Sequence, residues 1–131
     1  MRKNREKKRV VILGSTGSIG RSALQVLKSF EDRFEIFGLS AHKNFELFKK
    51  QIREYKPKMA VLTQAESYEK VKRGYINNRI KIEFGAESIN QMVSSPEVDI
   101  VINAIVGSAG LLPSFATLRA GKTLALANKE S

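Results

Sequence analysis

The stretch RVVILGSTGSIG, residues 9–20, decides the fold of this chain. It opens with a short run of β-branched and aliphatic residues, which is typical of a strand buried on both faces of a sheet. Three glycines, Gly14, Gly17 and Gly20, then follow at regular spacing. From residue 18 to residue 29 the apolar residues recur at helical spacing. The stretch therefore predicts a strand, a tight glycine turn and a helix in immediate succession.

The rest of the chain continues this alternation with short connections. Strands are expected at residues 34–39, 59–62, 80–84, 98–103 and 123–126, and helices at residues 44–55, 66–73, 87–93 and 111–119. Asn44 is a suitable N-cap, Pro57 ends the helix that follows it, and Gly121 ends the last helix. Because right-handed crossovers between parallel strands place helices on both faces, we expect an α/β fold. Its sheet is doubly wound, mostly parallel and Rossmann-like, with helices on both faces.

Composition excludes several classes of protein. The chain has 131 residues, of which 42% are hydrophobic and 27% charged, as in an ordinary one-domain globular protein. It has no cysteine, which excludes a disulfide scaffold, a thiolate zinc site and a cysteine nucleophile. His42 is its single histidine, so a histidine-rich metal site is excluded as well. No apolar run reaches the ~18 residues of a membrane span, and no secretory signal is present, so we expect a cytoplasmic protein.

The net charge of +10 is concentrated at the start of the chain. Residues 1–9 hold six lysines and arginines against Glu6. A basic arm of this kind binds nucleic acid in some proteins; the alternative is a solvated, poorly ordered leader before the first strand. Tryptophan is absent, and no basic patch with interleaved aromatics follows the arm. We therefore expect a leader over residues 1–9, one domain over residues 10–131, and no nucleic-acid or membrane partner.

The glycine loop has the features of a dinucleotide site. One glycine of the three makes the tight turn, a second lets the backbone approach a pyrophosphate, and a third lets the helix pack against the strand. The free N–H groups at the start of the helix then face the phosphates, and Thr16 and Ser18 add hydroxyl donors. The alternative is a tight turn that binds nothing. No G-x-x-x-x-G-K-[ST] sequence is present, which argues against a P-loop NTPase.

The loop after the second strand indicates which dinucleotide is bound. An acidic residue that holds the ribose 2′-hydroxyl of NAD is expected ~20 residues beyond the glycine loop. Residues 38–44 contain no Asp or Glu and offer His42, Lys43 and Asn44 instead. Because a cation suits a 2′-phosphate, we predict NADPH rather than NADH. The alternatives are that Lys43 is an ordinary exposed lysine, and that His42 is a loop residue or an acid–base catalyst.

A second loop of small residues follows the strand at 98–103. Gly107, Ser108 and Gly110 lie in it, and such a loop can pass close to the nicotinamide ribose, where larger side chains would collide. The alternative is a plain strand-to-helix turn. We expect this loop at the same edge of the sheet as the glycine loop, because the carboxyl ends of parallel strands meet there.

The segment ANKES at residues 127–131 directly follows the last strand, and four of its five residues are polar. Asn128 is placed to hydrogen-bond the ribose or the nicotinamide, and Glu130 to accept a hydroxyl. Lys129 is placed to meet a phosphate or to polarise a carbonyl, which makes it the candidate catalytic residue. The alternative is that these residues are polar only because they end the chain.

Four blocks of sequence together resemble one enzyme family, the 1-deoxy-D-xylulose 5-phosphate reductoisomerases. They are LGSTGSIG at 13–20, AIVGSAGLLP at 104–113, RAGK at 119–122 and ANKES at 127–131. The resemblance implies an oxidoreductase of the non-mevalonate isoprenoid pathway that rearranges its phosphosugar substrate to an aldehyde. NADPH then reduces the aldehyde to 2-C-methyl-D-erythritol 4-phosphate, and a divalent cation, Mg²⁺ or Mn²⁺, holds the substrate oxygens as a Lewis acid.

The resemblance also implies roles for particular residues. NADPH contacts are implied for Gly14, Thr16, Gly17, Ser18, Ile19, Gly20, His42, Lys43, Asn44, Asn128 and Glu130, and a substrate contact for Lys129. Within this set, residues 16–19 would contact the NADPH phosphates, and residues 42–44 would surround the adenosine 2′-phosphate. Members of the family more often have glycine where this chain has His42.

Length is the main departure from the family, whose members run well over twice as far. Their additional domain carries the acidic metal ligands, and residues 1–131 contain no plausible acidic cluster. We therefore expect an NADPH-binding domain that binds cofactor weakly and has no turnover by itself, its parent enzyme being a homodimer. Two alternatives remain: a dehydrogenase similar to aspartate-semialdehyde dehydrogenase, which needs a cysteine in its second domain, and a stand-alone dinucleotide-binding module.

Overall fold

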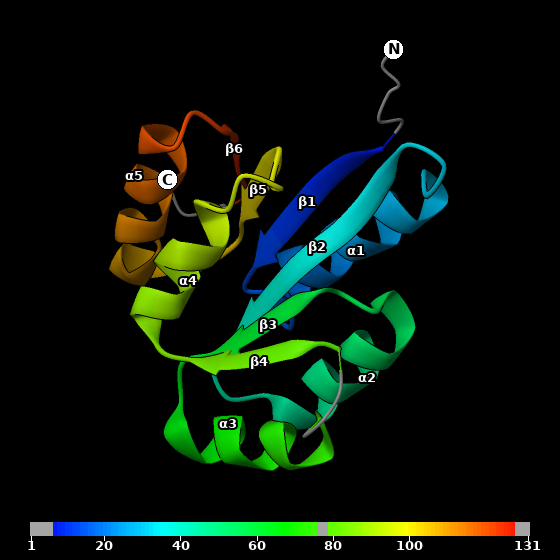
Figure 1. Cartoon of the computed structure of the whole chain (residues 1–131), viewed down its shortest axis with the longest axis vertical. Helices are drawn as coiled ribbons and strands as arrows, with labels where there is room; N and C mark the ends of the chain where they lie inside the picture. Colours follow the sequence, from blue (N-terminus) through cyan, green and yellow to red (C-terminus); the bar gives the residue numbers. More distant parts are fainter. Residues whose placement is uncertain (1–6, 76–78, 128–131) are drawn as a thin grey trace.

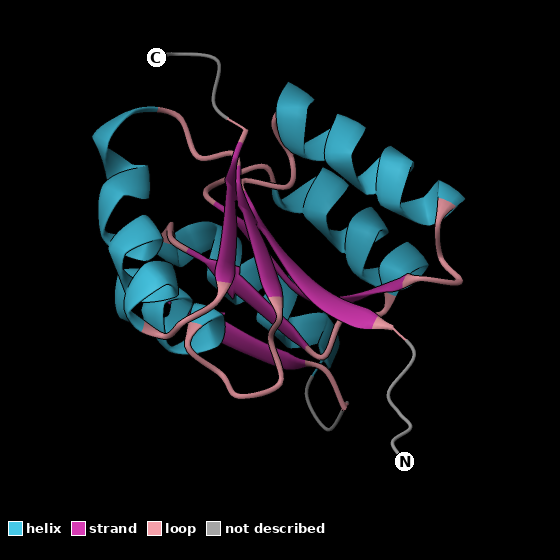
Figure 2. Ribbon diagram, turned by 90° about the horizontal axis from the view of Figure 1, so that it is seen from above, coloured by secondary structure: helices cyan, strands magenta, loops and turns pink. Residues whose placement is uncertain are grey.

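The computed structural model describes residues 7–75 and 79–127 as a parallel sheet between two layers of helices (Figure 1, Figure 2). Its strands are β1 (Lys8–Leu13), β2 (Phe34–Ala41), β3 (Met59–Leu62), β4 (Lys81–Phe84), β5 (Ile100–Asn103) and β6 (Thr123–Leu126). Its α-helices are α1 (Ser18–Ser29), α2 (Phe45–Tyr55), α3 (Ala65–Lys72), α4 (Ala86–Val93) and α5 (Leu111–Arg119). Two short 3-10 helices complete it, η1 (Arg73–Tyr75) and η2 (Gly107–Gly110).

The strand order is β4-β3-β2-β1-β5-β6, and every neighbouring pair is parallel. From β1 the chain winds outward through β2 and β3 to β4, then crosses back and adds β5 and β6 on the other side of β1. The order therefore reverses between β1 and β5. Ligands of such sheets bind outside the carboxyl ends of the strands at this reversal. The predicted doubly wound fold is confirmed, with a sheet that is parallel throughout the described residues.

The two faces of the sheet carry separate hydrophobic cores, because successive side chains of a strand point to opposite faces. Val10 and Ile12 of β1 pack under α1, α2 and α3, whereas Val11 and Leu13 face α4 and α5. All four of these side chains are fully buried. The helices contribute the other half of each core: Leu24, Leu27, Phe48, Ile52 and Val71 on one face, and Ile89, Met92 and Val93 on the other.

The bounds of the elements agree with the sequence analysis to within two residues at each end, and β2 continues two residues beyond the expected strand, to Ala41. The strand expected at 98–103 begins at Ile100, because the Asp99 carboxylate accepts a hydrogen bond from the backbone N–H of Arg9 at 2.9 Å. The first strand begins at Lys8, so Lys8 and Arg9 lie in the sheet; residues 1–6 of the expected leader lie outside the described part. The short turn η2 within the second small-residue loop was not expected.

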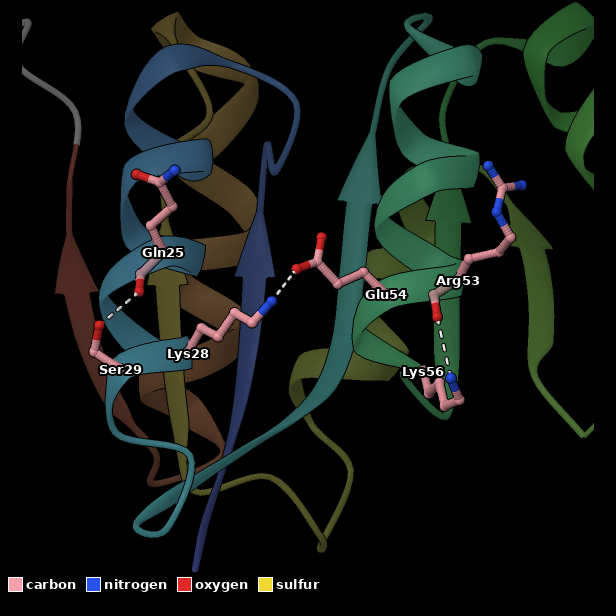
Figure 3. Close-up of polar contacts among 6 residues, drawn as sticks. All are labelled: Gln25, Lys28, Ser29, Arg53, Glu54 and Lys56. Carbon is pink, nitrogen blue, oxygen red and sulfur yellow. Dashed lines mark hydrogen bonds and ion pairs between the residues drawn. The ribbon is translucent and has the colours of Figure 1, made fainter.

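Helices α1 and α2 lie side by side on one face, and an ion pair between Lys28 and Glu54 joins their outer surfaces (Figure 3). The hydrogen bond to Glu54 raises the pKa of the Lys28 ammonium. Both side chains are about half exposed, so the pair contributes little to stability. It lies near the carboxyl ends of these helices, away from the glycine loop at the start of α1.

Large apolar residues are exposed on α5 and on the segments that precede and follow it in the chain. Leu112 is 66% exposed and Leu126, on the edge strand β6, is 70% exposed. The others are Val106, Leu111, Phe115 and Leu118. None of the helices in the described ranges is long and apolar enough to cross a membrane.

Candidate dinucleotide-binding site

The glycine loop between β1 and α1 is anchored by the end of β2. The backbone N–H groups of Gly14 and Ser15 both donate to the carbonyl oxygen of Ser40, at 3.1 and 2.9 Å. Gly14 adopts a φ of +75°, which L side chains rarely adopt. The first residue after β1 therefore turns sharply across the end of the neighbouring strand, as the sequence predicted for a tight turn.

A buried carboxamide holds the same loop from the side of α2. The Ser15 hydroxyl donates to Gln51 Oε1 at 2.7 Å, and Gln51 Nε2 donates to the Ser15 carbonyl oxygen at 2.9 Å. Ser15, Ser40 and Gln51 are all at least 95% buried. The sequence analysis did not single out these residues. One signal was available: Gln51 lies at helical spacing from Phe48 and Tyr55, and is thus a polar residue on the apolar side of the helix.

The three glycines of the loop differ in whether the packing of the chain requires glycine at that position. A Cβ atom on Gly20 would lie 2.1 Å from the Gly14 carbonyl oxygen, and a Cβ on Gly14 would lie 3.0 Å from the Ala104 carbonyl oxygen. Gly17 has an ordinary extended backbone with a φ of −77°, and the nearest atom to its Cβ would be 3.7 Å away. The packing of the chain therefore requires glycine at 14 and 20, whereas at position 17 there is room for a side chain.

Free backbone donors lie beside Gly17 at the start of α1. In the described part of the chain, the N–H groups of Thr16, Ser18 and Ile19 have no acceptor. The first hydrogen bond of helix α1 is made by Arg21, whose N–H donates to the Gly17 carbonyl at 2.9 Å. Unpaired N–H groups and the positive end of the helix dipole favour an anion at this position.

The second small-residue loop meets the glycine loop at the carboxyl end of β5. Asn103, which is 2% exposed, shapes it: its Nδ2 donates to the Gly110 carbonyl at 2.8 Å, and its Oδ1 accepts from the N–H of Ile105 at 3.1 Å. The close approach of Ala104 to Gly14 brings the two loops into contact. Both glycine-containing loops therefore flank the reversal of strand order, as predicted.

The turn of residues 42–44 continues from β2, next to the strand end that anchors the glycine loop. His42 Nδ1 lies 2.8 Å from the Thr63 hydroxyl, and the Asn44 carboxamide oxygen caps α2 by accepting from the N–H of Leu47 at 3.3 Å. Lys43 is held through its backbone carbonyl, and its side chain is exposed. The turn thus has a fixed backbone that displays a cation at the same edge of the sheet.

Comparison with known proteins identifies the family. The model of the 1-deoxy-D-xylulose 5-phosphate reductoisomerase family matches residues 10–131. The chain belongs to this family. Reductoisomerases of Geobacillus sp. and Phocaeicola vulgatus are 40% and 41% identical to it, each over 95% of the chain. These matches decide against the alternative similar to aspartate-semialdehyde dehydrogenase.

Solved reductoisomerase structures share the fold. The enzyme from Zymomonas mobilis in complex with NADPH matches with a TM-score of 0.86 and 33% identity, covering 95% of this chain and 33% of that one. A reductoisomerase in complex with NADPH, fosmidomycin and magnesium matches with a TM-score of 0.84 and 33% identity, over 95% of this chain and 31% of that one. The chain spans about a third of the length of the reductoisomerases it matches.

Three of the candidate site residues lie outside the described part of the chain. The backbone is described as far as Ala127, whose N–H donates to the Asn103 carbonyl at 3.0 Å; the candidate residues Asn128, Lys129 and Glu130 follow beyond it. Within residues 7–75 and 79–127, no three His, Asp or Glu side chains gather as metal ligands.

Two open hollows, of about 310 and 650 Å³, lie at the amino ends of the strands and include no residue of the glycine loop.

Proposed function

We propose that this chain is the NADPH-binding domain of an enzyme that converts 1-deoxy-D-xylulose 5-phosphate to 2-C-methyl-D-erythritol 4-phosphate. The observation that carries the proposal is the glycine loop at the reversal of strand order. Its middle glycine, Gly17, is not required by the packing of the chain, and unpaired N–H groups lie beside it. A pyrophosphate that approaches the backbone here explains both features. The family structures solved with NADPH support the same ligand.

The residues present fit the phosphates of NADPH. Thr16, Gly17, Ser18 and Ile19 would surround the pyrophosphate with backbone N–H groups and two hydroxyls. The adjoining turn would select the 2′-phosphate, because it displays Lys43 and contains no carboxylate. Asn44 caps α2 with its oxygen, which leaves its amide N–H groups to donate, and His42 keeps Nε2 for a phosphate oxygen. NADPH supplies the hydride of the reduction, and the described residues bind and orient it.

The remaining parts of the activity are proposed for the longer enzyme. Asn128 and Glu130 would contact NADPH, and Lys129 the phosphosugar substrate. The additional domain that the family resemblance implies carries acidic metal ligands, so the Mg²⁺ or Mn²⁺ ion would take its ligands from polypeptide outside this chain. The full enzyme would act in the non-mevalonate isoprenoid pathway, as a homodimer in the cytoplasm.

A titration of the purified chain with NADPH and, separately, with NADH tests the proposal. We expect saturable binding that favours NADPH, and a Lys43→Ala variant that loses this preference while it keeps its NADH affinity. Lys50→Ala is the matched control, because Lys50 is an exposed lysine further along α2. Equal losses for both dinucleotides in Lys43→Ala would contradict the 2′-phosphate assignment, and a lack of any binding would contradict the proposal as a whole.

The chain by itself is expected to have no turnover. With substrate, Mg²⁺ and NADPH present, the absorbance of NADPH should remain constant, because the family resemblance implies that the acidic metal ligands lie in the additional domain. Measurable oxidation of NADPH by the pure chain would refute this expectation.

A further inference from the structure

In the contact between Gln51 and Ser15, one buried carboxamide uses both its donor and its acceptor on a single residue. Gln51 Nε2 donates to the Ser15 carbonyl at 2.9 Å and Oε1 accepts from the Ser15 hydroxyl at 2.7 Å. Gln51 is 5% exposed and Ser15 is fully buried. The hydroxyl has a second acceptor, the Ser40 carbonyl, at 3.3 Å. The Ser15 carbonyl, in turn, accepts a hydrogen bond from the Gln51 amide.

Holding this carbonyl determines the direction of the next N–H group. A trans peptide is planar, and its C=O and N–H point in opposite directions. Because the Ser15 carbonyl points towards Gln51 and the interior, the N–H of Thr16 points away from α2. That N–H has no acceptor in the described part of the chain. Thr16 is also the first residue of the segment that would bind the pyrophosphate.

We propose that Gln51 is a positioning residue for the dinucleotide, which orients the Ser15–Thr16 peptide so that the Thr16 N–H faces the pyrophosphate. The inference rests on the proposed NADPH function and adds a residue outside the glycine loop to it. Gln51 itself does not touch the ligand. Its helix, α2, begins at the Asn44 cap beside the expected 2′-phosphate site, so the same rigid element supports both phosphate-binding segments.

Two substitutions distinguish the hydrogen bond that the Ser15 carbonyl accepts from the one that the Ser15 hydroxyl donates to Gln51. Gln51→Leu removes both bonds and keeps a side chain of similar size. Ser15→Ala removes only the bonds of the hydroxyl, to Gln51 Oε1 and to the Ser40 carbonyl, so Gln51 still holds the Ser15 carbonyl. We expect Gln51→Leu to weaken NADPH and NADH by the same factor, about ten-fold, as for the loss of one hydrogen bond to a charged group. Ser15→Ala should stay within about three-fold of the wild type, because the peptide remains oriented.

Binding should be measured well below the melting temperature of each variant, so that a loss of stability does not count as a loss of affinity. Adenosine 2′-monophosphate serves as a control ligand, because it has the 2′-phosphate and lacks the pyrophosphate. We expect its affinity to be unchanged in Gln51→Leu. A merely structural role would lower the melting temperature and leave the dinucleotide affinities unchanged, which would overturn the inference. Equal weakening of adenosine 2′-monophosphate would also overturn it.

A second measurement does not depend on whether the variants fold. In the NMR spectrum of the wild-type chain, saturating NADPH should shift the Thr16 amide resonance, and adenosine 2′-monophosphate should not. A Thr16 amide that does not respond to bound NADPH would overturn the inference while leaving the proposed function intact. A wild-type chain that binds neither dinucleotide would overturn the proposed function and, with it, this inference.

Discussion

Alanine at Gly17 is expected to separate ligand binding from stability, because the packing of the chain does not require glycine there. The Gly17 backbone has φ −77° and ψ 171°, which any residue adopts, and a new Cβ would meet no atom of the described residues closer than 3.7 Å. Gly17→Ala should therefore change stability by less than about 1 kcal/mol, because the lower entropy of the unfolded chain is offset by the poorer fit of alanine to the N-cap of α1. If a pyrophosphate lies against this residue, the added methyl group would displace it and weaken NADPH binding strongly.

Gly20→Ala is the matched contrast within the same loop. Its Cβ would lie 2.1 Å from the Gly14 carbonyl oxygen and 2.8 Å from Ser15 Cα, and both of these are backbone atoms that must move. Overpacking of this kind costs about 3 kcal/mol at the upper end of its usual range. In a domain of this size that lowers the melting temperature by roughly 10 °C.

Urea denaturation measures the stability of both variants, and NADPH fluorescence measures binding under folded conditions. The reasoning predicts a stable Gly17→Ala chain that does not bind and an unstable Gly20→Ala chain. Wild-type NADPH affinity in Gly17→Ala would refute the placement of the pyrophosphate. Wild-type stability in Gly20→Ala would refute the account of the close approach between α1 and the loop.

Further predictions concern the core, the cap of α2 and an ion pair. Leu24→Ala should cost about 2–5 kcal/mol of unfolding free energy, because Leu24 is 2% exposed. Leu112→Ala is the control and should stay within about 0.5 kcal/mol, because Leu112 is 66% exposed. Similar losses for both variants in urea denaturation would contradict the assigned core. Asn44→Asp should keep the cap and the melting temperature but reduce the preference for NADPH over NADH, because its carboxylate repels the 2′-phosphate; an unchanged preference would place the 2′-phosphate elsewhere. Because Glu54 raises the pKa of Lys28, the ion pair contributes its small stability at pH values below the unfolded pKa of lysine and loses it as the pH rises through the folded pKa. Melting temperatures of the wild type and of Lys28→Met should therefore converge at high pH, and a difference that persists there would contradict this assignment.

Local sequence determined most of the elements of this chain. The helix at 18–29 and the strand at 59–62 have the predicted bounds, because apolar periodicity and punctuation by glycine, proline and capping residues act over a few neighbouring positions. The alternation of the elements also predicted the parallel, doubly wound sheet. Four short blocks of sequence were enough to indicate the family, and the family match confirms it.

The hydrogen bonds that hold the glycine loop in place were decided only by the tertiary structure. Gln51 is 36 positions from Ser15 along the chain, and Ser40 is 25 positions from it. Which of these polar residues meet depends on which strands become neighbours and on how α2 lies against the glycine loop, and no local pattern specifies that.

The tertiary structure also decided which of the three glycines the packing of the chain requires. Their spacing predicted a tight turn, an approach of the backbone to a pyrophosphate and the packing of the helix against the strand, but it did not assign these roles to particular glycines. Gly20 is required because α1 passes within contact distance of the Gly14 carbonyl, whereas no atom of the described residues comes closer than 3.7 Å to the position of a Cβ on Gly17. Local periodicity therefore sets the elements, whereas the distances between non-neighbouring backbones decide which residues are left to bind a ligand.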